Sequence, residues 1–449
     1  MSRRLRRAAF AVVAGLLVAL AWTDAAAAFD GFGEMTAESD YGDVIRFEVA
    51  LEGGPPERLE VLLHFGDDAA TFVAPVDPDR EAASYEWDAA ASHVVPNTSI
   101  VYSWRALDGD GEVVAVSPEE SHVYDDDRPG LDWQALELGA ATVHWYGGAE
   151  AQARRFGDGA AQAAVAAEEL LGSPLAAPID IFVYRTRDEF FGALGPGARE
   201  WTGAAAYPDL RTVFLYLEGS AESYLDRVVT HEVTHVVFHD ATDNPYHEPA
   251  HWLNEGLAAW SELRAPSDQT AVVEREAAGE GLFAFEALTD QFPIGDRGSA
   301  LAYAQGTVMV DRIIADHGVE AIAAMAAAYR EGASDAEALE AATGVEAEQL
   351  YADFYAAFGA PEPEPIAPEP LLPSEVDVPG DPAATAAASG EPPSGPDRPA
   401  GDPDERPADG SGDADWLPVV VVAGIAVAVA GLIVLVAIRR RASRSEHGG

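Results

Sequence analysis

The sequence predicts an α+β fold in two folded domains, an all-β domain followed by a domain of strands and then helices. Between residues 29 and 127, apolar and polar residues alternate over short segments, which is typical of half-buried strands. From residue 128 to residue 360, a few such strands give way to long segments with apolar residues every three or four positions, which is typical of helices. The 449 residues are enough for two or three domains of roughly 150 residues each.

The composition excludes several classes of function. The chain has 27 basic and 77 acidic residues, a formal net charge of −50, and such a surface repels a phosphate backbone, so we expect no nucleic-acid partner. It contains no cysteine, which excludes disulfides, zinc–thiolate sites and a cysteine nucleophile. Any metal ion must therefore be held by histidine and carboxylate side chains.

Residues 1–28 have the pattern of a secretory signal peptide. Four arginines between residues 3 and 7 are followed by the apolar stretch Ala8–Trp22, and Ala26 and Ala28 are the small residues expected before a cleavage site. The alternative is an uncleaved N-terminal anchor.

The first domain, residues 29–127, is expected to contain about seven short strands. Turn-forming residues at 53–56 and 108–111 separate strands at hairpin spacing. Such a pattern over about a hundred residues predicts an immunoglobulin- or fibronectin-like sandwich. The acidic turn at 108–112 is interpreted as a hairpin turn in preference to a Ca²⁺ loop. The clearest alternation of apolar and polar residues is found at 45–51, 59–65 and 102–106.

The second domain, residues 128–360, is expected to begin with strands and to end in helices. Strands are predicted at 142–146, 179–184 and 212–217, and a first, alanine-rich helix at 149–171. Further helices are predicted at 223–239, 250–263, 299–317, 319–330, 334–343 and 346–358. Strands followed by helices within one domain indicate the α+β class.

The C-terminal part predicts a stalk and a membrane anchor. Residues 361–415 hold 14 prolines and 14 acidic residues but almost no large apolar side chain, so we expect an extended, disordered stalk. Residues 416–438 are the predicted transmembrane helix, because the uncharged run Leu417–Ile438 spans roughly 33 Å as a helix, about a bilayer core. Four arginines follow, so the positive-inside rule makes residues 439–449 a cytoplasmic tail and places the folded domains outside the cell.

The helix predicted to start near residue 223 contains the sequence His231-Glu-Val-Thr-His235. Two histidines four positions apart lie about 40° from each other around a helix, so both rings can reach one metal ion. Glu232 follows the first histidine and can act as a base beside a water molecule at that ion. The segment therefore predicts a zinc site with its own general base.

A catalytic zinc ion needs a third protein ligand. The metzincin pattern would place a glycine at position 238 and a histidine at position 241, but the residues there are Phe238 and Ala241. Twenty residues after His235, Glu255 lies in the segment Trp252-Leu-Asn-Glu-Gly-Leu-Ala258. Glu255 is therefore the predicted carboxylate ligand.

The two motifs resemble gluzincin zinc metallopeptidases, especially the aminopeptidase N type, whose third ligand lies in a Trp-Leu-Asn-Glu-Gly helix. The resemblance implies a thermolysin-like zincin catalytic domain. In that family a glutamate follows the ligand by seven residues, and Glu262 is expected to support a ligand histidine in the same way. The family's Tyr-x-Lys-Gly motif carries a tyrosine that stabilises the oxyanion. By resemblance, Tyr303 in the segment Tyr303-Ala-Gln-Gly306 takes this role.

The layout from about residue 40 to residue 360 is still more similar to bacterial peptidase-MA-like surface proteins. These combine a sandwich domain, a short metallopeptidase domain and a late Tyr-Ala-Gln helix. Compared with aminopeptidase N, the loop between His235 and Glu255 is one residue longer, and Gln305 replaces the lysine of the tyrosine motif. The segment 203–207 stands where aminopeptidases have a Gly-Ala-Met-Glu-Asn strand.

The sequence thus predicts a membrane-anchored, extracytoplasmic Zn²⁺-dependent metallopeptidase acting on peptides or proteins. Glu232 is the expected general base and Tyr303 the expected oxyanion donor. An endopeptidase is favoured because segment 203–207 contains no glutamate to bind a free α-amino group. The alternatives are an aminopeptidase and a catalytically silent zinc-containing binding module. Neither the substrate nor the oligomeric state follows from the sequence.

Four further residues near the motifs have open or minor roles. Asn254 serves either the local backbone geometry or a substrate carbonyl. Three histidines between the motifs are potential rival ligands, of which His251 is the strongest because it directly precedes the second motif. Glu255 is preferred over all three because it lies in the more specific motif. The other two rivals are His239 and His247.

Overall fold

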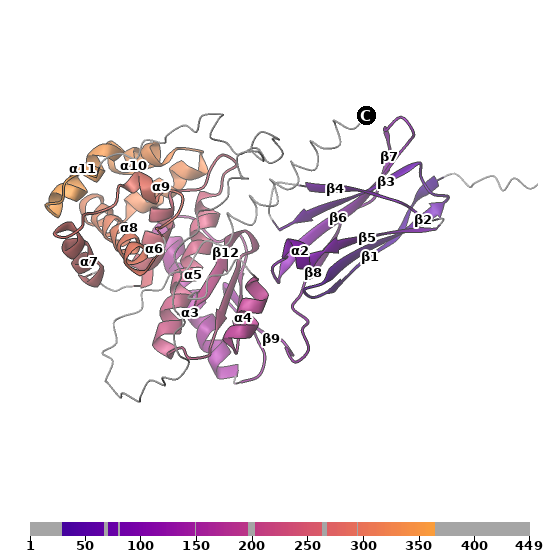
Figure 1. The fold of residues 1–449 in the computed structure, drawn as a ribbon, viewed down its shortest axis with the longest axis horizontal. Coiled ribbons are helices and arrows are strands. Elements are labelled where there is room, and N and C mark those ends of the chain that lie inside the picture. The colour runs from indigo at the N-terminus through magenta and orange to yellow at the C-terminus, as the bar shows by residue number, and fades with distance from the viewer. Residues whose placement is uncertain are drawn as a thin grey trace, which may run out of the picture.

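The computed structural model describes residues 29–66, 71–79, 81–148, 150–195, 203–262, 267–293 and 295–363 (Figure 1). The predicted signal peptide, transmembrane helix and cytoplasmic tail, and all but the first residues of the predicted stalk, lie outside these ranges. Among the helices of the described residues, none has both the length and the hydrophobicity needed to cross a membrane.

The first domain consists of two antiparallel sheets (Figure 1). One sheet has the order β1-β2-β5, and the other has the order β4-β3-β6-β7, with β8 paired to β6. A single helical turn, α2, follows β5. The elements are β1 (Phe29–Asp40), β2 (Val44–Gly53), β3 (Arg58–Phe65), β4 (Thr71–Val76), β5 (Ala82–Asp88), α2 (Ala89–Ser92), β6 (Thr98–Leu107), β7 (Val113–Val116) and β8 (Glu120–Tyr124).

Alternating side chains of these strands form a core between the two sheets. Phe47 on β2, Val61 on β3 and Trp104 on β6 are all fully buried in it. The turn after β6 is closed by Asp108, whose Oδ1 accepts the backbone N–H of Asp110 at 3.0 Å and of Glu112 at 2.9 Å. The expected β-rich N-terminal region and its hairpin turn are thus present, whereas the immunoglobulin or fibronectin type stays a prediction.

The second domain begins with a five-stranded sheet of order β12-β13-β11-β10-β9 in the described residues. The three inner strands run parallel, and the two edge strands are antiparallel to their neighbours. The strands are β9 (Gln134–Leu138), β10 (Ala141–Trp145), β11 (Ile179–Tyr184), β12 (Ala204–Tyr207) and β13 (Thr212–Tyr216). The helices are α3 (Glu150–Leu171), α4 (Arg187–Leu194), α5 (Glu222–Thr242), α6 (His251–Glu262), α7 (Ser267–Ala277), α8 (Asp296–His317), α9 (Glu320–Arg330), α10 (Asp335–Thr343) and α11 (Ala347–Ala357).

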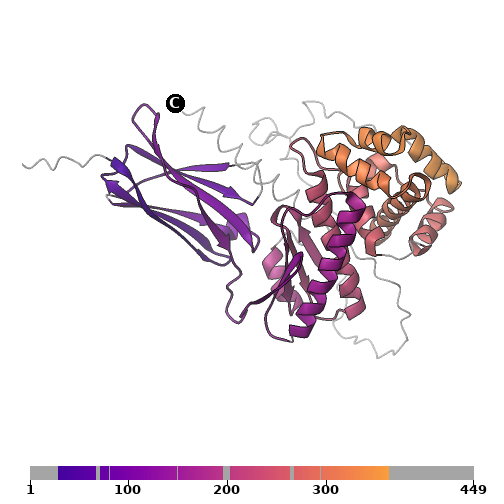
Figure 2. The ribbon, with the colours of Figure 1, turned by 180° about the vertical axis from the view of Figure 1, so that it is seen from behind.

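The sheet carries helices on both faces because its inner strands are apolar on both sides. Ile181 and Val213 face the core shared with α3 and α5. Phe182 and Phe214 point to the opposite face and pack with Phe190 of α4. Figure 2 shows α3 and α5 side by side along the sheet. The segment of α5 that carries the two histidines is therefore packed against the sheet.

The helices after α5 form the second half of the domain (Figure 1, red to orange). Every helix predicted between residues 128 and 360 is present, and most have ends within two residues of the prediction. The prediction omitted β9, β12, α4 and α7. The mixed α+β class is thereby confirmed.

Polar side chains join the two domains. Asn97, in the loop before β6, donates from Nδ2 to Thr212 Oγ1 of β13 at 2.8 Å. Arg128, in the segment that connects the domains, donates from Nε to the buried Asp126 carboxylate at 2.7 Å and from Nη2 to the Glu189 carbonyl at 2.9 Å. The Tyr184 hydroxyl of β11 also donates to Asp126, at 2.8 Å. The connection is thus part of the packed structure.

Candidate metal centre

Helix α5 presents the first motif from a buried position. His231, Glu232 and His235 are at most 4% exposed, because the helix lies between the sheet and the later helices. The neighbouring Val228, Val233 and Val236 are fully buried and fix the rotation of the helix. These are the side chains that the sequence predicted for a metal site.

Helix α6 adds Glu255 to this pair. Its Oε2 lies 3.4 Å from His231 Nε2 and 3.7 Å from His235 Nε2, and one donor atom of each residue lies within 4.8 Å of the others. Within the described residues, none of these three buried atoms has a well-aligned hydrogen bond. Such atoms are costly to bury unless a cation binds them. Two imidazoles and one carboxylate suit Zn²⁺ in both ligand type and number.

The outer nitrogen of each ligand histidine is held by a different partner. His231 Nδ1 lies 2.7 Å from Glu262 Oε1, and His235 Nδ1 lies 2.7 Å from Asn254 Oδ1. An oxygen acceptor at Nδ1 places the proton there and leaves the lone pair of Nε2 directed at the metal position. Glu262 thus stands where the resemblance placed it. Asn254, which sequence reasoning left undecided, orients His235.

The pKa values of the three candidate ligands are shifted by burial and by their contacts with one another. Burial disfavours the charged form of His231, but contacts with Glu255 and Glu262 raise its pKa well above the ordinary value. Burial lowers the pKa of His235 to about 4, so this ring is neutral at physiological pH. Burial would raise the pKa of Glu255, but the facing histidines lower it below its ordinary value. Neutral imidazole and ionised carboxylate are the forms that bind a metal ion, so His235 and Glu255 are ready to bind, whereas His231 must release a proton when the ion binds.

Glu232 lies beside the cluster, and its carboxylate has no well-aligned hydrogen bond to any described side chain. Burial and the nearby Glu255 raise its pKa to about 7, against the opposing effect of His231. The backbone of Ala206, on the edge strand β12, also faces this carboxylate and favours its charged form. A carboxyl group with a pKa near neutrality can both accept and release a proton at physiological pH.

Tyr303 of α8 contacts the cluster through Glu255. It is 2% exposed, and its hydroxyl is hydrogen-bonded to the carboxylate of Glu255. Burial, followed by the charge of Glu255, raises its pKa well above the ordinary value. The hydroxyl therefore keeps its proton and can donate it in a hydrogen bond.

Two glycines allow α8 to approach α6 closely. A Cβ on Gly306 would lie 2.5 Å from the Trp252 carbonyl oxygen, and a Cβ on Gly256 would lie 2.5 Å from the Gly306 carbonyl carbon. The helices therefore touch backbone to backbone, one turn from Tyr303 and directly beside Glu255. Any larger side chain at the crossing would separate these two residues.

Gln305, which replaces the lysine of the related motif, has a structural role. It is fully buried, and its side chain makes two hydrogen bonds to Phe283: Oε1 accepts the backbone N–H at 2.8 Å and Nε2 donates to the carbonyl at 3.0 Å. These bonds fix the segment before α8. The amide thus replaces a charged side chain without leaving a buried charge.

The rival histidines lie outside the group of three donors. His239 Nε2 is 3.1 Å from Asp209, and His247 Nδ1 is 3.1 Å from the Glu248 carbonyl. His251 Nε2 lies 3.7 Å from Glu255 Oε1, the oxygen that does not face the ligand histidines. None of the three therefore joins the candidate metal ligands.

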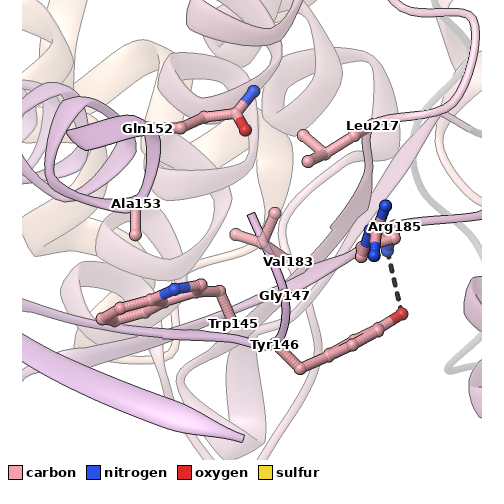
Figure 3. A pocket seen from close by; sticks show the side chains of 8 residues that line it. All are labelled: Trp145, Tyr146, Gly147, Gln152, Ala153, Val183, Arg185 and Leu217. Atoms are coloured by element: carbon pink, nitrogen blue, oxygen red, sulfur yellow. Dashed lines mark hydrogen bonds between the residues drawn. The ribbon is translucent and has the colours of Figure 1, made fainter. Parts of the chain in front are cut away.

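A small cavity lies elsewhere, at the carboxyl ends of β10 and β11 (Figure 3). Its volume of about 10 Å³ has room for at most one water molecule. At its edge the Tyr146 hydroxyl accepts the backbone N–H of Arg185 at 2.9 Å. It shares no residue with the metal cluster and is too small for a peptide. Its lining consists of Trp145, Tyr146, Gly147, Gln152, Ala153, Val183, Arg185 and Leu217.

Comparison with known proteins finds a family model that matches the region that holds the site. Residues 159–359 match the model of the Peptidase MA superfamily. No curated protein matches the chain. The resemblance inferred from the two motifs is confirmed for this region, and the cluster of histidines and glutamate it contains has the donor set of a Zn²⁺ site.

Two solved structures are similar over most of their length. A mutant M1 zinc metallopeptidase from Deinococcus radiodurans has 13% identity and a TM-score of 0.37, covering 73% of this chain and 92% of that chain. An aminopeptidase N family protein from Idiomarina loihiensis has 10% identity and a TM-score of 0.38, covering 71% of this chain and 75% of that chain.

Proposed function

We propose that the protein is a zinc-dependent endopeptidase that hydrolyses peptide bonds outside the cytoplasm. The observation that carries the proposal is the buried cluster of His231, His235 and Glu255, with Glu232 beside it. Three buried donor atoms directed at one point fit a metal ion, and an adjacent carboxyl group with a pKa near neutrality fits a general base. A purely structural metal site would need the three ligands but no carboxyl group at the position of Glu232.

The residues divide the reaction between them. When bound, Zn²⁺ polarises the peptide carbonyl and lowers the pKa of a water molecule. Glu232 accepts the proton of the attacking water and passes it to the nitrogen of the leaving amine. Tyr303 donates its hydroxyl hydrogen bond to the carbonyl oxygen as negative charge develops there. Asn254 and Glu262 keep both ligand histidines in the required orientation.

Cleavage within a chain is favoured over removal of its first residue. The edge strand β12 brings Ala204, Ala205 and Ala206 next to α5, and none of them can pair with an α-ammonium group. In the described residues β12 pairs with no strand other than β13, and the backbone of Ala206 faces Glu232, so the outer edge of β12 lies beside the site. Such an edge can bind an extended peptide by main-chain hydrogen bonds.

Peptides with free and with acetylated N-termini test this proposal on the purified full-length protein. We expect cleavage of both at internal bonds, with loss of activity in Glu232→Gln. Cleavage of the free peptides alone would make the protein an aminopeptidase. Bound zinc without any cleavage would favour the silent binding module.

We also propose secretion through residues 1–28 and anchoring through residues 416–438, supported by the charge pattern at the two ends of the chain. External protease added to intact cells should then cut within residues 361–415 and release a folded, zinc-containing fragment. A stalk that resists protease able to reach the cell surface would contradict this topology.

A further inference from the structure

We infer that Asn97 of the first domain is a positioning residue that holds strand β12 in place beside the candidate metal centre. The inference rests on the proposed function, in which the outer edge of β12 binds the peptide. It extends that function to a domain that supplies none of the candidate metal ligands. Asn97 acts through Thr212, the first residue of β13.

The loop that carries Asn97 is fixed within the first domain. Asn97 has a φ of 67°, in the left-handed region that asparagine adopts more readily than most residues. Its backbone N–H donates to the Tyr124 carbonyl at the end of β8, at 2.8 Å. The Thr98 hydroxyl donates to the Val95 carbonyl at 2.6 Å and closes the loop. The side-chain amide of Asn97 therefore has a defined position from which it can hold a partner.

The partner is the hydroxyl group of Thr212. Asn97 Nδ2 donates to Thr212 Oγ1 at 2.8 Å and makes a longer contact, 3.4 Å, with Asp180 Oδ2 on β11. Thr212 is fully buried, so water does not compete for this hydrogen bond. The same hydroxyl donates to the Leu210 carbonyl at 2.9 Å. Asn97 is thus connected through one hydroxyl to the turn between β12 and β13.

This turn determines where β12 lies relative to the centre. Thr212 is paired in the sheet with Tyr207, the last residue of β12. The residue before it, Ala206, has its backbone facing the carboxylate of Glu232. Only a short run of backbone therefore separates the Asn97 hydrogen bond from the part of β12 beside the expected general base.

Apolar contacts of the first domain reach the same hairpin. Val95, two residues before Asn97, packs against the apolar cluster to which Ala205 and Tyr207 of β12 belong. Gly66, directly after β3, lies so close to Leu210 that a Cβ there would be 2.8 Å from Leu210 Cδ2. The first domain thus supports the β12–β13 hairpin by packing as well as by the hydrogen bond.

Helix α5 holds the hairpin from the other side. Arg211 Nη2 lies 3.1 Å from Asp240 Oδ1, and His239 Nε2 lies 3.1 Å from Asp209 Oδ1. The turn is therefore held between the first domain and the helix that carries the two ligand histidines. Contacts on both sides are needed to fix its position, because either set alone leaves the hairpin free to move away from the other.

Loss of the Asn97 hydrogen bond should loosen β12 without disturbing the metal ligands, which lie on α5 and α6. An edge strand that binds the substrate and the transition state equally well affects KM and leaves kcat unchanged. The expected signature is therefore a higher KM and faster hydrogen exchange of the β12–β13 hairpin. Zinc affinity should not change.

The test measures hydrogen exchange, zinc affinity and peptide cleavage on variants of the full-length protein. Asn97→Gly removes the amide and keeps a residue that adopts a positive φ without strain. Backbone amides between residues 204 and 212 should exchange about fivefold faster, the effect of one lost hydrogen bond. Amides of α6 should exchange as in the wild type. KM should rise about fivefold, with kcat and zinc affinity within about twofold of the wild type.

Two further comparisons show whether the effect runs through Thr212. Thr212→Val removes the hydroxyl and should reproduce the effect of Asn97→Gly, whereas Thr212→Ser keeps the hydroxyl and should resemble the wild type. The double variant should be no worse than either single variant, because both remove the same hydrogen bond. Tyr184→Phe is the matched control: it removes a hydrogen bond of 2.8 Å to Asp126 between the same domains, but from β11, and should leave the hairpin unchanged.

The alternative outcomes are equally definite. Unchanged exchange between residues 204 and 212, or unchanged KM despite faster exchange, would overturn the inference. Equal acceleration by Tyr184→Phe would also overturn it, because a general loosening of the two domains would then explain the result. If Asn97→Gly does not fold, Thr212→Val and Thr212→Ser carry the same comparison. A wild type that cleaves no peptide would refute the proposed function, while the exchange rates would still decide whether Asn97 holds β12.

Discussion

Gly306 of α8 and Gly256 of α6 meet backbone to backbone, so that neither position has room for a Cβ atom. This contact sets the distance between two helices that carry different parts of the site. The ligand Glu255 precedes Gly256 directly, and Tyr303 lies one helical turn before Gly306. The geometry of the site therefore depends on a contact between two glycines, which have no side chain that could take part in the reaction.

Gly306→Ala should accordingly damage both stability and activity. A methyl group would lie 2.5 Å from the Trp252 carbonyl oxygen, and such overpacking costs about 1–3 kcal/mol. Urea unfolding measures this loss, and zinc titration measures the effect on the site. Gly159→Ala on α3 is the control, because its Cβ would meet no atom within 4 Å and alanine favours the helix. An unchanged unfolding midpoint for Gly306→Ala would contradict the close crossing.

Glu232→Gln and Glu255→Ala should separate the general base from the metal ligand. Glu232→Gln removes only the base, so zinc content should stay near one ion per chain while kcat falls by about 10²–10⁴-fold. Glu255→Ala leaves two histidines and should lose most of the zinc. Metal analysis and peptide cleavage on the same preparations give both values. Zinc loss in Glu232→Gln with retention in Glu255→Ala would reverse the assigned roles.

Glu262→Ala should weaken zinc binding by about 10–100-fold, because His231 loses the acceptor at its Nδ1. Glu262→Gln keeps an oxygen acceptor and should retain most of the affinity. Chelator competition compares the two variants with the wild type. If Ala and Gln weakened binding equally, the charge of Glu262 would matter and the hydrogen bond to His231 would not.

Tyr303→Phe should lower kcat by about 10²–10³-fold with little change in KM, which is the usual loss of one oxyanion donor. Phenylalanine keeps the packing against Phe292, so the melting temperature should change little. The value of kcat and the melting temperature are both measured on the Tyr303→Phe variant. Normal turnover with a lowered melting temperature would make Tyr303 a packing residue that supports Glu255.

The acid stability of the fold should depend in part on Glu189. Burial would raise its pKa, but hydrogen bonds from Thr186 and from the Tyr146 hydroxyl, at 2.6 Å, lower it below the ordinary value. The resulting stabilisation is fully present above the unfolded-state pKa of about 4.3 and is lost as the pH falls through the lower folded-state pKa.

Glu189→Gln removes this titration, so its unfolding midpoint in urea should fall less steeply than that of the wild type below about pH 4.3. Asp188→Asn, one position away, controls for the change in net charge. Parallel curves for the wild type and Glu189→Gln would show that the carboxylate contributes no pH-dependent stability.

The strongly periodic parts of the fold were predictable, and the short or polar parts were not. Helix α5 has many buried apolar residues at helical spacing and was predicted within three residues at each end. Helix α7 buries little beyond Val273 and Glu276, so it has almost no apolar pattern to detect. Strand β12 is four residues long, and its three alanines have no preference for strands.

At the site, the motifs predicted the residues that face the metal but not all those behind them. The spacing of His231 and His235 follows from helix geometry alone, and Glu255 lies in a specific motif. The role of Asn254 was only partly predictable, because an amide next to a metal ligand can hydrogen-bond either to a ligand histidine or to a substrate. The contacts of His251 depend on Phe292, which lies beyond α7 and has no sequence relationship to the motif.

The ion pair between Asp126 and Arg128 has a consequence for how the protein can be divided. A boundary between residues 127 and 128, where the sequence pattern changes, would cut this pair and leave the Tyr184 hydroxyl without its acceptor. Recombinant fragments that start at residue 128 would expose the guanidinium that now bonds the Glu189 carbonyl, one turn into α4. The smallest independently folding catalytic fragment should therefore begin before Asp126, so that it includes the residues just upstream of the change in sequence pattern at residues 127 and 128. A screen of truncations stepped through residues 120–130 would locate this limit by soluble yield.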